Sequence, residues 1–364
     1  MKILIFNWRD IKNPEAGGAE VFTHENSKRW VKKGNEVTLF TSEFKNCKKE
    51  EFVDGVRIIR AGGKYSVYKK AKEYYKKQFS KEGFDIIIDE INTLPFFTPK
   101  FVKKEKIIAL IHQLAKEYWF YETIFPINFI GYYFLENNWL KNYTNIPTIT
   151  VSESTKKDLV DLGFKKIYVV SEGISFEPLK KYPKKEKEPT IIYVGRLKRA
   201  KRPGHVIKAF EIVEKEIKDA KIWVVGDGYL REKLENTNNK KIKFFGRVSE
   251  KEKIKLLSKA WVLVNPSVRE GWGINIIEAN ACFTPCIAYD VPGLRDSIIN
   301  KKTGLLVKEN GNIKKLAEAI IKILEDEKLR LKLSKNALKH SKKFNWNKSA
   351  KEFLKIIEVI MNEK

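Results

Sequence analysis

Residues 261–297 decide the fold, and they read WVLVNPSVREGWGINIIEANACFTPCIAYDVPGLRDS. The run 261–265 is short, apolar and closed by a proline, which is typical of a parallel strand buried on both faces. A glycine-bearing loop follows, and from Gly273 apolar residues recur at helical spacing. Ile287 and Ala288 form the next strand. This βαβ order predicts an α/β fold, in which ligands bind at the carboxyl ends of the strands.

The loop at 270–273 has the composition that a polar ligand requires. Gly271 and Gly273 let the backbone approach a ligand without an intervening Cβ, so that amides can point at sugar or phosphate oxygens. Glu270 precedes the predicted helix, and Glu278 lies about two turns later. On one helix they would be about 12 Å apart, whereas a retaining glycosidase pair needs about 5 Å. We therefore expect the two acids to bind different parts of one extended ligand.

The motif resembles the signature of the retaining GT-B glycosyltransferases of family 4, the glycosyl transferases of group 1, and the likeness extends over essentially the whole chain. It implies two doubly wound, Rossmann-like α/β domains that face each other across a cleft. It also implies that Glu278 binds the ribose hydroxyls of a nucleotide and that Glu270 lies beside the donor sugar. Backbone amides would meet hydroxyls of that sugar at Trp272, Gly273 and Ile274.

Two further loops carry groups that suit a diphosphate. Gly17 and Gly18 stand between the first predicted strand and a helix, where backbone amides form an anion cradle. Arg196 and Lys201 follow the predicted strand 190–194, and two cations there would stabilise a departing diphosphate. The resemblance implies that both pairs contact the diphosphate of the donor.

The remaining candidate residues depend more heavily on the resemblance. His112 ends the predicted strand 106–111; a lone histidine is more often structural, but this place faces the expected cleft, and in the family it lies near acceptor and donor sugar. The backbone at Arg247 and Val248 would approach the nucleotide base. Phe283 and Arg202 stand where the family usually has glycine. At Phe283, which follows the motif helix, a residue other than glycine in the left-handed conformation would cost about 1 kcal/mol, or the helix ends differently.

The length of 364 residues suits two domains. We expect a Rossmann-like domain for the acceptor at 1–171, a charged linker at 172–189, a nucleotide-sugar domain at 190–345, and a terminal helix at 346–364 that returns to the first domain.

The charge of +26 admits several interpretations. The lysines are spread along the chain and no nucleic-acid signature occurs, so we expect no nucleic acid as partner. The richness in Lys, Glu and Ile resembles a thermophile composition, and a basic surface also attracts an anionic membrane. Three cysteines indicate a reducing compartment, and neither a secretory signal nor a membrane span is evident. We therefore expect a cytoplasmic protein, peripheral on the inner face of the membrane.

Residues 117–143 are the most aromatic stretch and read EYWFYETIFPINFIGYYFLENNWLKNY. A packed helical hairpin between the domains is the favoured interpretation. The alternative is a surface for a membrane interface or for a lipid-bearing acceptor.

These features predict an enzyme that moves a sugar from a nucleotide-sugar to a lipid or saccharide acceptor with retention at the anomeric carbon. The catalytic candidates are His112, Glu270, Arg196 and Lys201. No Asp-rich metal loop occurs, so we expect neither a metal nor a cofactor. A nucleotide-sugar epimerase or a phosphorylase of the same fold is the nearest alternative. A basic nucleic-acid-binding protein is the alternative from another class.

Overall fold

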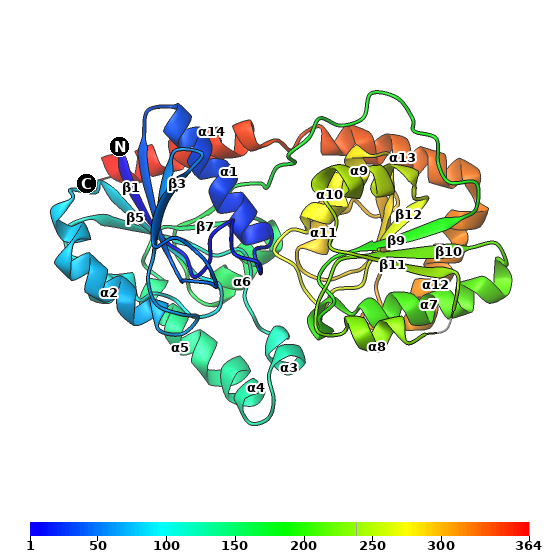
Figure 1. Cartoon of the computed structure of the whole chain (residues 1–364), viewed down its shortest axis with the longest axis horizontal. Coiled ribbons are helices and arrows are strands. Elements are labelled where there is room, and N and C mark those ends of the chain that lie inside the picture. Colours follow the sequence, from blue (N-terminus) through cyan, green and yellow to red (C-terminus); the bar gives the residue numbers. More distant parts are fainter. Residues whose placement is uncertain (238, 364) are drawn as a thin grey trace. The chain divides into compact units, whose positions relative to one another are not determined.

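The computed structural model describes residues 1–237 and 239–363, and these form two compact units (Figure 1). The first unit comprises Met1–Lys116, Phe129–Gly173 and the chain from Asn345 onward. The second comprises Glu117–Asn128 and Ile174–Phe344. Each unit is an α/β domain built on a single twisted sheet, so the predicted pair of α/β domains is confirmed.

The first unit contains an eight-stranded sheet in the order β3-β4-β2-β1-β5-β6-β7-β8. Its strands are parallel except β3, which pairs antiparallel with β4. The strand order reverses between β1 and β5, so the loops that follow these two strands diverge at a switch point. The strands are β1 (Lys2–Phe6), β2 (Glu36–Thr41), β3 (Glu50–Val53), β4 (Val56–Arg60), β5 (Ile86–Glu90), β6 (Lys106–Leu110), β7 (Thr148–Thr150) and β8 (Ile167–Val169).

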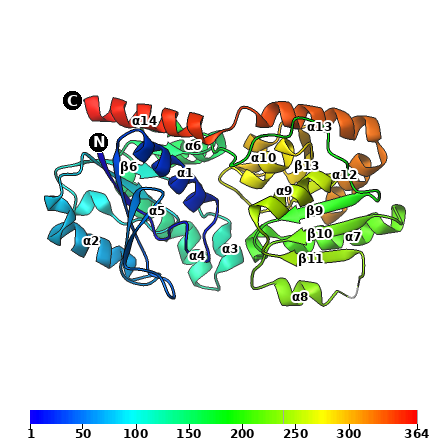
Figure 2. The ribbon, with the colours of Figure 1, turned by 45° about the horizontal axis from the view of Figure 1, so that its top comes forward.

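Helices cover both faces of this sheet (Figures 1 and 2). On one face an aromatic cluster that includes Phe6, Phe40 and Phe79 fills the core beneath α2. On the other, α14 lies along α1, where the Trp30 indole donates to the Ala350 carbonyl at 3.1 Å and packs edge-on against Phe353. The helices are α1 (Gly18–Lys32), α2 (Val67–Lys77), η1 (Phe79–Lys81), η2 (Thr98–Lys100), η3 (Gly131–Leu135), α5 (Glu136–Leu140), η4 (Lys141–Tyr143), α6 (Glu153–Asp161) and α14 (Trp346–Asn362).

The second unit contains a six-stranded, fully parallel sheet in the order β11-β10-β9-β12-β13-β14. This is the doubly wound order 3-2-1-4-5-6, whose switch point lies between its first and fourth strands. Here that point falls between β9 and β12. The strands are β9 (Thr190–Val194), β10 (Lys221–Val225), β11 (Ile242–Gly246), β12 (Val262–Asn265), β13 (Cys286–Tyr289) and β14 (Gly304–Val307).

The helices of this unit bury one continuous apolar core against the sheet, as a parallel sheet requires. The amphipathic α7 and α12 pack against each other on one face, and α9, α10 and α13 cover the other (Figure 2). The helices are η5 (Arg199–Lys201), α7 (Pro203–Glu216), α8 (Arg231–Glu235), α9 (Glu250–Lys259), α10 (Ile274–Ala281), α11 (Leu294–Ser297), α12 (Ile313–Glu325) and α13 (Glu327–Ser341).

The units differ from the predicted domains in two places. The segment predicted as a linker, 172–189, is no free tether, because from Ile174 it clusters with the second unit. Its Leu179 amide donates to the Ala281 carbonyl at 2.9 Å, and Glu186 forms ion pairs with Lys221 and Lys259. In addition, α3 (Tyr118–Glu122) clusters with the second unit, although it follows β6 of the first sheet. The stretch 117–143 is thus a series of short helices, with α4 (Ile127–Ile130) after α3.

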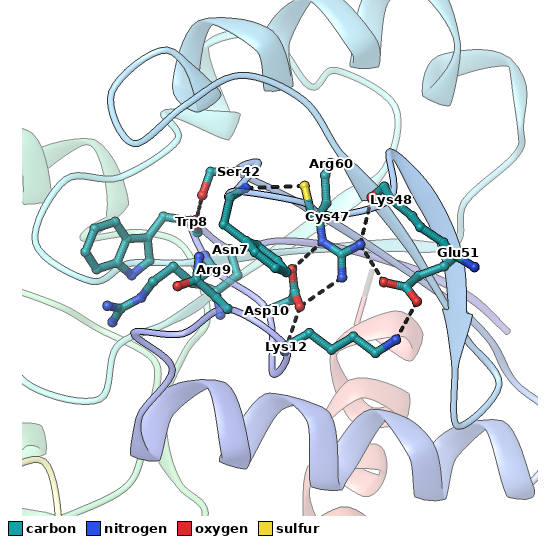
Figure 3. A network of polar contacts seen from close by, with 12 residues as sticks. Asn7, Trp8, Arg9, Asp10, Lys12, Ser42, Cys47, Lys48, Glu51 and Arg60 are labelled. Atoms are coloured by element: carbon teal, nitrogen blue, oxygen red, sulfur yellow. Dashed lines mark hydrogen bonds and ion pairs between the residues drawn. The ribbon is translucent and has the colours of Figure 1, made fainter. Parts of the chain in front are cut away.

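A buried ion pair fixes the loop between β1 and α1 (Figure 3). The Arg60 guanidinium, at the end of β4, donates to both carboxylate oxygens of Asp10 at 2.7 and 3.0 Å. Both side chains have no exposed surface. A further Arg60 nitrogen donates to Glu51 at 2.7 Å and to the Lys48 carbonyl at 2.8 Å. The fork therefore ties the loop that leads to Gly17 and Gly18 onto the edge of the sheet.

Asp10→Ala is expected to lower the free energy of unfolding of the first unit by about 3–5 kcal/mol, because it leaves part of a buried guanidinium without its partner. Chemical denaturation of the full chain measures the loss. Glu318→Ala is the control, since it breaks the exposed Lys315–Glu318 pair and should cost about 0.5 kcal/mol or less. Equal losses in the two variants would contradict the structural role of the fork.

Candidate active site

Three predicted site residues of the second unit lie on loops at the switch point of its sheet. The loop after β9 carries Arg196 and Lys201, and the loop after β12 carries Glu270. The two loops touch through their backbones, where the Val268 amide donates to the Ala200 carbonyl at 3.0 Å. The two loops follow the strands that the sequence predicts at 190–194 and 261–265, and the strand order brings the loops together.

Lys201 and Glu270 form an ion pair at the centre of this edge. The Lys201 ammonium lies 2.6 Å from one Glu270 oxygen, and the Ser267 hydroxyl donates to the other at 2.8 Å. Burial opposes the charge of Lys201, but the Glu270 carboxylate and the nearby Tyr118 raise its pKa above the ordinary value. Lys201 is therefore a cation at neutral pH. Ser267 has no counterpart among the residues that the sequence singled out.

Glycine permits the close approach of a second backbone to Glu270. Gly293, after β13, has φ of +81°, and a Cβ built there would lie 2.1 Å from the Glu270 carbonyl oxygen. The Glu270 amide in turn donates to the Pro292 carbonyl at 3.1 Å. Gly273, at the start of α10, also has a left-handed conformation with φ of +93°. The loop 270–273 is thus held by backbone contacts that a larger residue at 293 would push apart.

The loops after β9 and β10 are joined in the same way. A Cβ at Gly226 would lie 1.9 Å from the Gly195 carbonyl oxygen, and one at Gly228 would lie 2.5 Å from the Leu197 carbonyl oxygen. Arg196 lies between these contacts, with its carbonyl accepting from the Tyr193 hydroxyl at 2.9 Å. Its position is therefore set by backbone packing, while the residue stays partly exposed.

Asparagine side chains attach α10 to the switch point. The Asn275 amide group donates to the Val194 carbonyl at 2.7 Å, and the Asn265 amide group donates to the Asn275 oxygen at 3.3 Å. These bonds link the ends of β9 and β12 to the first turn of α10, whose amides face the same edge. Trp272, just before the helix, is buried and packs against Phe344 with ring centroids 5.2 Å apart. Ile274 is the first residue of the helix.

Glu278 lies on the second turn of α10 and is almost fully buried, with an ion pair to Lys253 of α9 at 2.8 Å. Burial opposes the charge of Lys253, but Glu278 and Glu250 raise its pKa above the ordinary value. Glu250 lies 2.9 Å from the same ammonium and is largely exposed. Lys253 therefore orients the carboxylate of Glu278. The role of Lys253 could not be predicted from the sequence, because one lysine among 72 Lys and Arg residues does not stand out.

Both positions that depart from the glycine pattern adopt the left-handed conformation. Phe283 has φ of +56° just past α10 and Arg202 has φ of +48° just before α7. Phe283 completes a Schellman motif, in which the Thr284 amide donates to the Ala279 carbonyl at 2.9 Å. The helix therefore ends as it would with glycine, and the Phe283 ring packs against Tyr182 with centroids 5.4 Å apart.

The short helix α3 packs over the loops of the switch point. Glu117 forms an ion pair with Arg269 at 2.8 Å, and the Tyr118 ring lies 5.6 Å from the Lys201 ammonium. The Glu122 carboxylate accepts from the Ala200 amide at 2.9 Å and from the Tyr229 hydroxyl at 3.0 Å. These contacts link residues about 80 to 150 positions apart in the chain, and for that reason no local pattern predicts them.

Arg247 and Val248 follow β11, two strands away from β9 at the same edge. Arg247 is exposed and Val248 packs against the core of the unit. Their predicted approach to a nucleotide base stays a prediction.

The other predicted residues belong to the first unit. Gly17 caps α1, and its amide donates to the Glu20 carboxylate at 2.6 Å, with Gly18 as the first helical residue. His112 is buried just past β6. Contacts of these residues with a donor or an acceptor stay predictions.

Residues 1–237 and 239–363 show neither a cluster of metal ligands nor a membrane span. In that part of the chain, no three His, Cys, Asp or Glu side chains are grouped so that they could hold a metal ion. None of the helices described there is long and apolar enough to cross a membrane.

Comparison with known proteins assigns both halves of the chain. Residues 16–177 match the family described as Glycosyltransferase Family 4, and residues 176–340 match the family described as Glycosyl transferases group 1. Among solved structures, the sucrose-phosphate synthase of Thermosynechococcus elongatus superposes with a TM-score of 0.81 at 21% identity, covering 99% of this chain and 98% of that one. A glycosyltransferase from Rickettsia africae gives 0.75 at 19% identity, covering 100% and 99%. The GT-B fold predicted from the sequence is thereby confirmed.

Curated relatives match over part of their length. A capsular polysaccharide biosynthesis glycosyltransferase of Staphylococcus aureus is 30% identical over 60% of this chain and 62% of its own length. An uncharacterised glycosyltransferase of Methanocaldococcus jannaschii is 36% identical over 42% and 44%. A Campylobacter jejuni N-acetylgalactosaminyltransferase named for an undecaprenol diphosphate substrate is 34% identical over 35% and 33%. The matches span between 33% and 62% of the length of these curated relatives.

Gly293→Ala is expected to displace the loop that carries Glu270, because the new Cβ would overlap the Glu270 carbonyl. Gly311→Ala is the matched control: its φ is +90°, but its Cβ would have no neighbour closer than 3.9 Å. The control should cost about 1 kcal/mol in unfolding free energy from backbone strain alone. Gly293→Ala should cost at least about 1 kcal/mol more, measured by chemical denaturation. Equal costs would show that the contact at 293 is easily relaxed.

Proposed function

Since the chain belongs to the GT-B glycosyltransferases of family 4, we propose that it transfers a sugar from a nucleotide-sugar donor to a lipid-linked or saccharide acceptor. The observation that carries the proposal is the switch point of the second sheet. There, Lys201 and Glu270 form a partly buried ion pair beside Arg196, and Glu278 lies on the adjoining helix.

Each group has a chemical task in such a transfer. Arg196 and Lys201 offer the positive charge that a nucleoside diphosphate needs as the glycosidic bond breaks. Glu278 is held by Lys253 and offers carboxylate oxygens to the two ribose hydroxyls. Glu270, with the backbone amides at Trp272, Gly273 and Ile274, takes the hydroxyls of the donor sugar. Gly17, Gly18 and the backbone of Arg247 and Val248 complete the proposed contacts with diphosphate and base.

We further propose that the sugar is transferred with retention and without a metal ion. The two cations of the second unit would stabilise the leaving diphosphate, which is the task of a divalent metal in other transferases. Glu270 is engaged with Lys201 and Ser267, an arrangement that favours binding over nucleophilic attack. The acceptor therefore enters on the side of the leaving group. A covalent glycosyl group trapped on Glu270 would contradict this mechanism.

The donor is tested by calorimetric titration with a panel of UDP, GDP and ADP sugars in EDTA. One member should bind, and Glu278→Ala should weaken it by about 10- to 100-fold, because charged hydrogen bonds to the ribose are lost. Glu250→Ala is the control: it removes the exposed partner of Lys253 and should leave affinity within about twofold. Adding Mg²⁺ should change neither affinity nor rate.

Other outcomes would identify the alternatives. Release of free sugar and nucleotide without an acceptor would indicate an epimerase. Turnover with orthophosphate that ignores the nucleotide would indicate a phosphorylase. Oligonucleotide affinity that falls steeply with salt and is untouched by Glu278→Ala would indicate a nucleic-acid-binding protein.

The acceptor side is supported by one segment of the chain and by the names of relatives. Residues 123–135 contain no charged side chain in a chain that is 32% charged. Seven of their large apolar side chains are between 41% and 79% exposed: Ile124, Phe125, Ile127, Phe129, Ile130, Tyr133 and Phe134. Exposed aromatic and aliphatic side chains of this kind enter the headgroup boundary of a bilayer. We propose that this segment contacts an anionic membrane peripherally, where a lipid-linked acceptor such as that named for the Campylobacter relative would lie.

Flotation with vesicles tests this contact. The protein should float with vesicles of anionic phospholipid and less with neutral ones, because the chain carries a charge of +26. The double substitution Ile124→Ser and Phe125→Ser should weaken flotation at least about tenfold, since both side chains are more than 70% exposed. Phe52→Ser removes a ring that is 70% exposed elsewhere and should change nothing. No flotation with either vesicle would rule the membrane contact out.

A further inference from the structure

Three acidic and basic side chains from different strands converge in the first unit at the carboxyl edge of its sheet. Glu90 ends β5, His112 follows β6, and Glu172 follows β8. The His112 Nε2 atom lies 3.3 Å from Glu90 Oε1, and its Nδ1 atom lies 3.9 Å from Glu172 Oε1. The three side chains are 0% to 8% exposed. His112 is therefore held between two buried carboxylates.

Neighbouring helices hold the second carboxylate oxygen of Glu90 and the backbone carbonyl of His112. The Thr23 hydroxyl of α1 donates to Glu90 Oε2 at 2.5 Å, which leaves Oε1 directed at the imidazole. The His112 carbonyl accepts from the Thr155 hydroxyl of α6 at 3.1 Å. Gly173 fits tightly against the start of α14, since a Cβ there would lie 2.5 Å from the Trp346 amide nitrogen, and this places Glu172. The two carboxylates are thus preorganised around His112 by contacts of their own.

We propose that Glu90 and Glu172 are positioning residues that keep His112 protonated and oriented, so that His112 meets the substrate as a charged hydrogen-bond donor and not as a general base. The kinetic half of this inference, that His112 meets the substrate as a charged donor, rests on the proposed function. The structural half, that Glu90 and Glu172 keep His112 protonated and oriented, does not.

The electrostatics agree with the geometry. Burial alone would lower the pKa of His112, but the neighbouring carboxylates of Glu172 and Glu90 outweigh it and raise the pKa to about 9. The other charged groups of this cluster are Glu20 of α1, which acts on Glu90, and Arg9, which neutralises Glu20 at 3.0 Å. The Phe22 ring packs edge to face against the imidazole and brings no charge. At neutral pH the imidazole therefore carries a proton on both nitrogens and has no lone pair to accept another.

The ring nitrogens of His112 are buried and have capacity for a further hydrogen bond. Within residues 1–237 and 239–363, neither ring nitrogen of His112 makes a hydrogen bond of ordinary geometry, and neither does Glu90 Oε1. Buried donors and acceptors of this kind are normally satisfied. A hydroxyl or phosphate oxygen that accepts from the imidazolium would satisfy this hydrogen-bonding capacity. A histidine whose hydrogen bonds were all made within the protein could not bind such an oxygen.

The structural half is tested by NMR titration of the free protein labelled at histidine. The chain has four histidines, and His112→Gln identifies the signal. Wild-type His112 should titrate well above the ordinary value of about 6.5. Glu90→Gln and Glu172→Gln, which keep the shape of each side chain, should each lower its pKa by about 1 unit or more. Asp54→Asn is the control, because it removes the carboxylate that contacts His24 and should leave the His112 titration in place.

The kinetic half uses the pH dependence of kcat/KM with the donor found by calorimetry. Activity should fall on the alkaline side as His112 loses its proton, and Glu90→Gln should move this limb to lower pH by the same amount as in the NMR titration. A His112 pKa at or below its ordinary value, or one that neither substitution changes, would overturn the proposal. So would an alkaline limb that ignores both substitutions. Absence of any nucleotide-sugar turnover would instead refute the proposed function, and the NMR result would still stand.

Discussion

Backbone-to-backbone contact between consecutive loops is the constraint on which the second unit depends. At the carboxyl edge of its sheet, the loop after β10 rests on the loop after β9, and the loop after β13 rests on the loop after β12. The contacts at Gly226 and Gly293 leave no room for a Cβ. Because the loops touch, the side chains of Lys201 and Glu270 are placed by main-chain geometry. The ion pair between them is then a consequence of this packing.

Much of this arrangement could be predicted from the sequence. The largely apolar runs at 190–194 and 261–265 coincide with β9 and β12, since a strand buried on both faces carries few polar residues. The glycine loop around Glu270 and the cations after β9 were readable as well, because strand, loop and helix follow each other within a few residues. A parallel sheet with this alternation has few possible orders. The meeting of Lys201 with Glu270 follows from that order.

Other features required the structure, because they depend on residues distant in the chain. In the sequence, Lys253 looks like the many other lysines expected on the surface. Only the packing of α9 against α10 shows that it orients Glu278. Likewise α3 follows a strand of the first sheet but packs with the second unit, through Glu122 and Ala200. The antiparallel strand β3 is absent from the strands expected above. The local sequence could have predicted this strand, because Asp54 and Gly55 form the left-handed turn typical of a two-residue hairpin.

The terminal helix α14 has a consequence for how the protein is made. It contributes Trp346 and Phe353 to the interior of the first unit, where they pack on Phe22 and Trp30 of α1. During synthesis, a domain that is continuous in sequence can fold as soon as it leaves the ribosome. The first unit here cannot bury this face of α1 until the entire second unit has been translated. The nascent chain therefore exposes the aromatic side chains of this face of α1 for most of its synthesis, and the second unit, whose own core needs no residue beyond Phe344, is free to fold first.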